Sequence, residues 1–297
     1  MLVVAIGAFL TISLLPLLAG RSNHSTVPTP AQQASGNADV QSELEARAQG
    51  YEAVLEREPD NQTAIQGLVE ARIQLGDLEG VVEPLEKLAS LNPNVPEYQI
   101  LLGQTKQALG DIEGAAQAYR TVLTSAPGNM QALQGLAALL LEQDRPQAAI
   151  GLLQDTLKTA PQTNEITPGA IDVASVQLLL AQVYVENQQV DEALRIYDDA
   201  IDAASDDFRP LLAKALVLRD IDQVAEAALL FEQAEEMAPA QYKDQVRALA
   251  AGGGEAEAIA PATEDGSSPI DTEATPDSES SSESEASDAS EDDDFVE

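Results

Sequence analysis

The sequence predicts an all-α fold, built as a solenoid of about five helix–turn–helix repeats. The first observation is a fixed period, because Pro59, Pro93, Pro127 and Pro161 stand 34 residues apart. The second is that small residues recur at two positions of this period and a large residue at a third. Small residues let two antiparallel helices approach closely, and the large residue fills the space against the neighbouring helix. Such an array buries its apolar surface between repeats.

The repeats are numbered so that each period proline falls at position 32. The windows are then 62–95, 96–129, 130–163, 174–207 and 208–241, with Pro239 at position 32 of the last. The small residues at positions 8 and 20 are Val69, Gly103, Ala137, Ala181 and Ala215, then Val81, Ala115, Ala149, Ala193 and Ala227. The large residues at position 24 are Leu85, Tyr119, Leu153, Tyr197 and Phe231.

Residues 1–20 carry no charge and form an apolar run. A helix of this length spans about 30 Å, the thickness of the bilayer hydrocarbon. We therefore expect a single-pass transmembrane anchor. The alternative is a cleaved secretory signal, which would leave a secreted or periplasmic soluble adaptor. Arg21, the cation that follows the run, favours the cytoplasmic side for the body of the protein.

Residues 21–38 are rich in Ser, Thr, Asn, Gln and Pro, which predicts a flexible spacer. Residues 39–58 predict a helix in the phase of a second repeat helix, with Leu44, Ala48 and Tyr51 on one side. Without a first helix of its own, this segment is interpreted as an N-terminal cap of the stack.

The turns inside the repeats carry recognisable signals. Gly76 and Gly110 predict a left-handed backbone at the end of the first helix. In the third repeat Asp144 is expected to cap the second helix, with Pro146 in its first turn. Pro84 should kink its helix or delay its start. The ten extra residues 164–173 either contribute binding or re-phase two halves of the array.

The C-terminal end divides into two parts. Residues 240–250 predict a short C-terminal capping helix. Residues 251–297 hold 16 acidic residues, no basic residue and nine serines, which predicts a disordered acidic tail. The net charge of −36 argues against nucleic acid as a partner, because phosphates would be repelled.

The repeat pattern resembles that of the tetratricopeptide repeat (TPR) family. Window 96–129 carries the signature residues Leu102-Gly103, Ala115, Tyr119 and Pro127. Window 174–207 repeats it in part, although Ser205 stands where the proline is usual. The resemblance implies a right-handed TPR solenoid whose first helices line a concave groove. The apolar N-terminus followed by such an array is similar to TPR assembly factors of photosynthetic and bacterial membranes.

The residue inventory predicts no enzyme and no cofactor. The chain has no cysteine and one histidine, His24, which falls in the predicted spacer. A catalytic triad needs an oriented imidazole, and a flexible segment does not supply one. Neither a glycine-rich phosphate loop with its lysine nor a metal-ligand spacing with histidine occurs.

The resemblance places the binding groove on the first helices. The implied partner is a protein or peptide held by apolar anchors and neutral hydrogen bonds. A cationic clamp for a terminal carboxylate is not expected, because the only groove cations fall in the last repeat. The candidate groove residues are Gln66, Glu70, Ile100, Gln104, Gln107, Gln134, Leu141, Leu178, Gln182, Arg209, Leu212 and Arg219. The predicted function is a membrane-tethered interaction scaffold that recruits a partner for assembly or maintenance of a membrane complex. The oligomeric state is not indicated.

Overall fold

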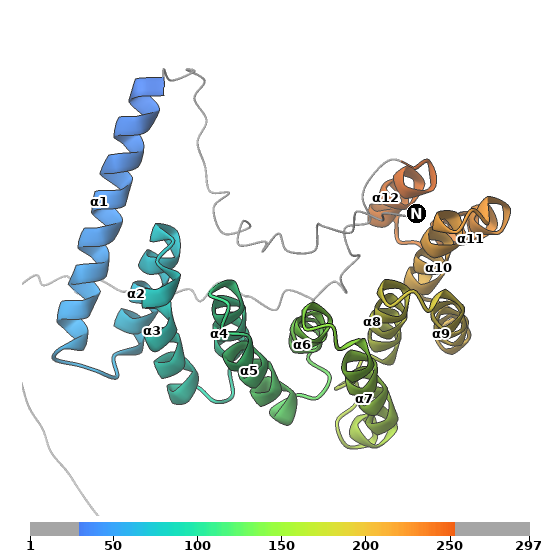
Figure 1. The fold of residues 1–297 in the computed structure, drawn as a ribbon, viewed down its shortest axis with the longest axis horizontal. Helices are drawn as coiled ribbons and strands as arrows, with labels where there is room; N and C mark the ends of the chain where they lie inside the picture. Colours follow the sequence, from blue (N-terminus) through green and yellow to red (C-terminus); the bar gives the residue numbers. More distant parts are fainter. Residues whose placement is uncertain (1–29, 253–297) are drawn as a thin grey trace, which may run out of the picture. The chain divides into compact units, whose positions relative to one another are not determined.

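The structure, a computed structural model, describes residues 30–252. Within this range the chain forms twelve α-helices and no β-strand, as the repeat pattern predicted. Successive helices pack as antiparallel hairpins in a curved row (Figure 1). The helices are α1 (Pro30–Leu55), α2 (Gln62–Leu75), α3 (Leu78–Leu91), α4 (Pro96–Ala108), α5 (Ile112–Ser125), α6 (Met130–Glu142), α7 (Pro146–Ile166), α8 (Val173–Glu186), α9 (Val190–Ala203), α10 (Phe208–Asp220), α11 (Val224–Met237) and α12 (Ala240–Ala250).

The predicted anchor at 1–20 and most of the predicted acidic tail lie outside the described residues. Between residues 30 and 252, no helix combines the length and the apolar character that a bilayer crossing requires.

The N-terminal helix begins earlier than predicted. The spacer was expected to reach residue 38, but α1 already starts at Pro30 and ends at Leu55. Proline is tolerated in the first turn of a helix, where its missing N–H has no partner to lose, and alanine and glutamine follow it. Ala48 and the half-buried Tyr51 of α1 pack against Leu68 of α2. The helix thereby covers the open end of the first hairpin.

The turn inside every hairpin has the same backbone shape at position 15. These residues are left-handed, with φ between 57° and 77°, whether or not they are glycine. The prediction that Asp144 caps α7 is wrong, because Asp144 is itself the left-handed residue and Arg145 takes the N-cap place without a side-chain hydrogen bond. The five position-15 residues are Gly76, Gly110, Asp144, Gln188 and Asp222.

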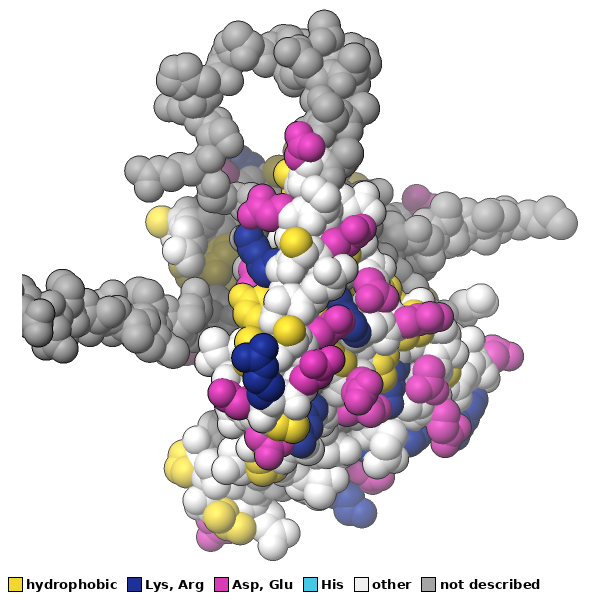
Figure 2. Space-filling view, turned by 90° about the vertical axis from the view of Figure 1, so that its left-hand side faces the viewer, with side chains coloured by type: hydrophobic (Ala, Val, Ile, Leu, Met, Phe, Trp, Pro, Cys, Tyr) yellow, Lys and Arg dark blue, Asp and Glu magenta, His cyan; other side chains and the backbone are white. Residues whose placement is uncertain are grey.

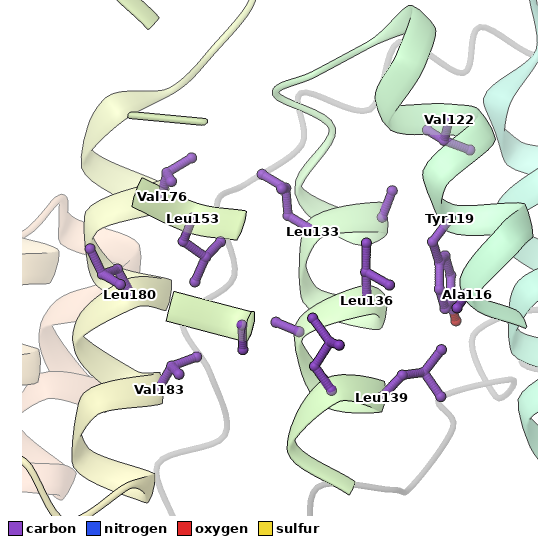
Figure 3. Close-up of a cluster of buried hydrophobic side chains, with 14 of the residues drawn as sticks. Ala116, Tyr119, Val122, Leu133, Leu136, Leu139, Leu153, Val176, Leu180 and Val183 are labelled. Carbon is purple, nitrogen blue, oxygen red and sulfur yellow. The ribbon is translucent and has the colours of Figure 1, made fainter. Parts of the chain in front are cut away.

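The core consists of several clusters of buried side chains along the array. Its largest cluster joins α4 to α8, with leucines of α6 at its centre (Figure 3). Tyr119, on α5, is 2% exposed and lies between two glycines, Gly103 of its own repeat and Gly135 of the next. A Cβ atom at either glycine would overlap the tyrosine ring. The glycines therefore set how closely the aromatic ring seats against α4 and α6.

Of the two outcomes expected at Pro84, a kink or a delayed helix start, the delayed start does not occur. Pro84 lies inside α3, which begins at Leu78, and its side chain is buried. A proline at this place cannot donate to the Gly80 carbonyl four residues earlier. The Arg72 guanidinium of α2 donates a hydrogen bond to that carbonyl instead and also pairs with Glu52 of α1. The arginine thus replaces the missing backbone donor and links three helices.

The predicted insertion at 164–173 is partly helix and partly a packed loop. Helix α7 continues through Pro161 and stops at Ile166. The Asn164 side chain then donates to the Ile171 carbonyl and accepts from the Ile171 N–H, both at 2.9 Å. Ile171 is 1% exposed and belongs to the main core cluster. Ile171, one of the extra residues, is therefore part of the main core cluster.

We predict that Gly135→Ala destabilises the array. The added methyl group must displace the buried Tyr119 ring, a cost of about 1–3 kcal/mol that exceeds the gain of roughly 1 kcal/mol from alanine in a helix. Gly151→Ala is the matched control, because it lies in the interior of α7 with no atom near the added methyl group. The urea unfolding midpoint should fall for the first variant and rise for the second. A rise for both would show that the tyrosine moves freely.

We predict that Arg72→Met and Pro84→Ala are energetically coupled. The arginine variant leaves the Gly80 carbonyl without a donor and should cost about 1–3 kcal/mol of unfolding free energy. Pro84→Ala restores the backbone N–H, so the same loss should be smaller in that background. Urea unfolding of the two single variants and the double variant measures the difference, with Glu52→Gln as the control that breaks only the ion pair. Additivity within about 0.5 kcal/mol would contradict the assignment.

Candidate functional site

The first helices of the repeats form the inner side of the curved row. Helix α4 contacts α6, α6 contacts α8, and α8 contacts α10, in addition to the contacts within and between hairpins (Figure 1). Hydrogen bonds cross between these helices: the Gln66 amide donates to the Tyr98 hydroxyl at 2.6 Å, and the Gln107 amide donates to Glu142 at 3.0 Å. We call this surface, built by α2, α4, α6, α8 and α10, the inner wall.

Eight of the predicted groove residues have side chains that reach the surface of the inner wall. Gln104 and Gln134 are exposed on neighbouring helices, and Leu141 and Leu178 are half-buried beside them. Amide groups both donate and accept hydrogen bonds, and leucines offer apolar contact. The accessible set is Gln66, Glu70, Gln104, Gln107, Gln134, Leu141, Leu178 and Gln182.

Two predicted groove residues belong to the core instead. Ile100 is 4% exposed and Leu212 is 1% exposed, so neither offers surface to a partner. Both stand at position 5, where Gln66 and Gln134 remain exposed in other repeats. This position lies at the boundary between wall and core: burial removes the apolar Ile100 and Leu212 from water, whereas Leu178 at the same position is half-buried.

Two further predicted groove residues, Arg209 and Arg219, are held by contacts within the chain. Arg209 binds Asp207 at 2.7 Å and lies 3.6 Å from Asp172, the residues that cap α10 and α8. Hydrogen bonding to Asp207, together with both carboxylates, raises the pKa of Arg209 above its ordinary value. Arg219 donates to the Leu249 carbonyl of α12 at 2.6 Å. These cations stabilise the C-terminal repeats.

Carboxylates of the inner wall are oriented by glutamine amides. Gln74 donates to Glu70 at 3.0 Å, and Gln182 donates to Glu186 at 3.2 Å. Burial raises the pKa of Glu186, and the Gln182 hydrogen bond partly offsets this. The wall therefore combines oriented acceptors and neutral amides, an arrangement that suits hydrogen bonding to a polypeptide.

Burial also perturbs the tyrosines behind the wall. Burial and the nearby Glu142 carboxylate raise the pKa of Tyr119 to about 12, and burial raises the pKa of Tyr197. Both phenols stay protonated at neutral pH, as expected of core residues that carry a polar tip.

Two tyrosines contribute to the polar network although neither was among the predicted groove residues. The Tyr98 hydroxyl accepts from Gln66, and the Tyr184 hydroxyl accepts from Gln154 of α7 at 3.0 Å. Tyr98 stands at position 3, outside the positions that the family pattern assigns to the groove. An aromatic residue on a first helix was the available signal, because the hydroxyl of a tyrosine that is partly buried usually finds a hydrogen-bond partner.

The described part of the chain shows no metal-binding cluster. Over residues 30–252 no cluster of three or more His, Asp or Glu side chains has a metal-binding arrangement. Viewed from the α1 end, acidic side chains are spread over the surface with fewer Lys and Arg between them (Figure 2). His24 lies outside the described residues.

Comparisons with known proteins agree with this geometry. Profiles of the tetratricopeptide repeat match residues 32–105, 107–167 and 178–242. The protein SLOW GREEN 1, chloroplastic, of Arabidopsis thaliana is 24% identical over 190 residues, which cover 64% of this chain. The alignment spans 59% of the length of that relative. The TPR repeat-containing protein PA0015 of Pseudomonas aeruginosa is 32% identical over 99 residues, 33% of this chain and 94% of its own length.

Solved structures also align with this chain at low identity. A crystal structure of MamA protein aligns with 62% of this chain and 94% of its own, at 21% identity and a TM-score of 0.40. A thermophilic TPR protein from Thermus thermophilus aligns with 64% of this chain and 97% of its own, at 20% identity and a TM-score of 0.40. TPR proteins act as scaffolds for protein–protein interaction. The repeat period, the stacked hairpins and the profile matches together show that this chain belongs to the tetratricopeptide repeat family.

Proposed function

We propose that this protein is a membrane-tethered scaffold that recruits a protein partner through its inner wall. The observation that carries the proposal is the exposed glutamine and leucine surface on successive first helices, exemplified by Gln104, Gln134 and Leu141. Such a surface offers hydrogen bonds and apolar contact along a row of adjacent helices, which matches a helical or extended segment of a partner.

The eight accessible residues of the inner wall include no Lys or Arg, so they offer no positive charge to the terminal carboxylate of a partner. Arg209 and Arg219 are engaged with Asp207 and with the Leu249 carbonyl, so they are not available to clamp a terminal carboxylate. An internal segment of a partner is therefore the better ligand.

The tether is proposed on the apolar sequence of residues 1–20. Membrane attachment would hold the array beside membrane-bound partners, which supports a role in assembly or maintenance of a membrane complex. The alternative is a soluble secreted or periplasmic adaptor, produced if the apolar segment is removed.

We predict that charge placed on the inner wall abolishes partner capture. Gln104→Arg with Gln134→Arg changes two exposed glutamines on α4 and α6, and Gln117→Arg with Gln147→Arg is the matched control on α5 and α7. Crosslinking in intact cells, followed by affinity capture and mass spectrometry, compares the two variants with the wild type. The inner pair should lose the partner because a charge must be desolvated in the contact. Equal partner lists from both pairs would rule out the inner wall.

We predict that the full-length chain stays in the membrane fraction after alkaline carbonate extraction. Sequencing of the protein's N-terminus then shows whether the apolar segment remains attached. A chain that begins at or after Arg21 and is released into the soluble fraction would instead establish the adaptor.

A further inference from the structure

Helix α11, the second helix of the last repeat, exposes several apolar side chains, two of them at positions that are covered in the earlier repeats. Val224 is 59% exposed and Leu229 is 61% exposed, and Ile221 in the preceding turn is 37% exposed. Ala225 and Ala228 are exposed beside them. Residues four apart lie next to each other on a helix, so Val224 with Ala228 and Ala225 with Leu229 form one strip. We call these four residues the α11 strip.

In the earlier repeats, the two positions that correspond to Val224 and Ala228 are not exposed. At position 17, where the last repeat has Val224, the four earlier repeats carry apolar residues that are half-buried. At position 21, where the last repeat has Ala228, they are buried or half-buried and two of them join the main core. A complete hairpin follows each of those repeats. The covered residues are Leu78, Ile112, Pro146 and Val190 at position 17, and Val82, Ala116, Ile150 and Leu194 at position 21.

After the last repeat only one helix follows in the described range. Helix α12 has the phase of a first helix, packs on α11, and ends after 11 residues, whereas α10 has 13. Because no complete hairpin follows α11 within residues 30–252, the α11 strip stays exposed in this range. Apolar side chains that form one strip offer a packing surface to an amphipathic helix.

Leu229 distinguishes the strip from an ordinary array end. It stands at position 22, which carries Glu83, Gln117, Gly151 and Arg195 in the earlier repeats. These four residues contribute no large apolar side chain at that place. A leucine with 61% of its surface exposed adds apolar area at the repeat that no complete hairpin follows within residues 30–252.

Acidic residues around the α11 strip favour a basic segment as its occupant over a second copy of this chain or over residues 251–297. Asp222, Glu226 and Glu232 are exposed on or next to α11, and no ion pair engages them within residues 30–252. A second copy of the chain brings a net charge of −36, and residues 251–297 bring 16 acidic residues and no basic one. Both are repelled, whereas a basic segment is attracted.

We propose that the α11 strip docks a basic amphipathic helix of a partner protein. Its apolar side packs on Val224 and Leu229, and its Lys or Arg residues face Asp222, Glu226 and Glu232. This surface is separate from the inner wall, so either can fail without the other.

The test uses the full-length protein and a fluorescein-labelled leucine–lysine peptide whose leucines repeat with helical periodicity. Fluorescence anisotropy compares it with a scrambled peptide of the same composition, which measures attraction by charge alone. We expect Val224→Gln with Leu229→Gln to weaken binding of the patterned peptide by about tenfold or more. Leu109→Gln, which changes an exposed leucine on the second repeat, is the matched control and should leave binding unchanged.

Further measurements decide between occupants. A photo-crosslinking group on the peptide should mark residues of 221–232, and replacing its lysines with glutamine should weaken binding. Crosslinks confined to 253–297 or to the inner wall, or equal binding of the patterned and scrambled peptides, would overturn the proposal. So would a change in sedimentation equilibrium between wild type and the double variant, because that result would make a second copy the occupant. Thermal unfolding of each variant checks that the array remains folded.

Discussion

The seating of a large side chain against small residues is the contact on which the array depends. A single hairpin cannot bury its apolar side, so each repeat is stable only when its neighbours close over it. Tyr119 shows how the closure works, because its ring lies between Gly103 within the repeat and Gly135 of the next one. Tyr51 of α1 meets Gly67 of α2 in the same way. The distance between successive first helices therefore follows from a ring packed on bare backbone.

The close spacing of the first helices also allows hydrogen bonds between them on the inner wall. First helices that lie side by side can exchange hydrogen bonds, as Gln66 does with Tyr98 and Gln107 with Glu142. The bonds hold amides and carboxylates in fixed directions before any partner arrives, which lowers the entropy that binding costs. Cations, by contrast, are drawn away from the wall: Lys106 pairs with Glu86 of α3, and Lys214 pairs with Asp198 of α9.

The periodic features could be predicted from the sequence, and the local exceptions could not. Five windows locate the hairpins because position 24 and the small residues repeat regardless of neighbours. Burial of Ile100 and Leu212 was missed, because position 5 lies at the edge of the core. There the glutamines stay exposed, whereas the apolar residues are buried to different degrees. The sequence also left the role of the insertion 164–173 open, because the contacts of Asn164 with Ile171 that anchor it follow no repeat pattern. The donor that compensates Pro84 lies on the preceding helix, which a local propensity argument does not consider.

The left-handed turn shared by the five hairpins costs more conformational free energy in some repeats than in others. Gly76 and Gly110 adopt it without a steric penalty, whereas Asp144, Gln188 and Asp222 place a Cβ atom in a crowded conformation that costs about 1–2 kcal/mol for most residues. The three strained corners follow α6, α8 and α10, of which α6 buries four leucines and α10 buries three, while α8 buries one. Burial of these leucines stabilises the hairpins whose corners are Asp144 and Asp222, and it offsets the cost of the distorted backbone there. The same turn is therefore free of steric strain in the first two repeats and depends on leucine burial in the third and the last.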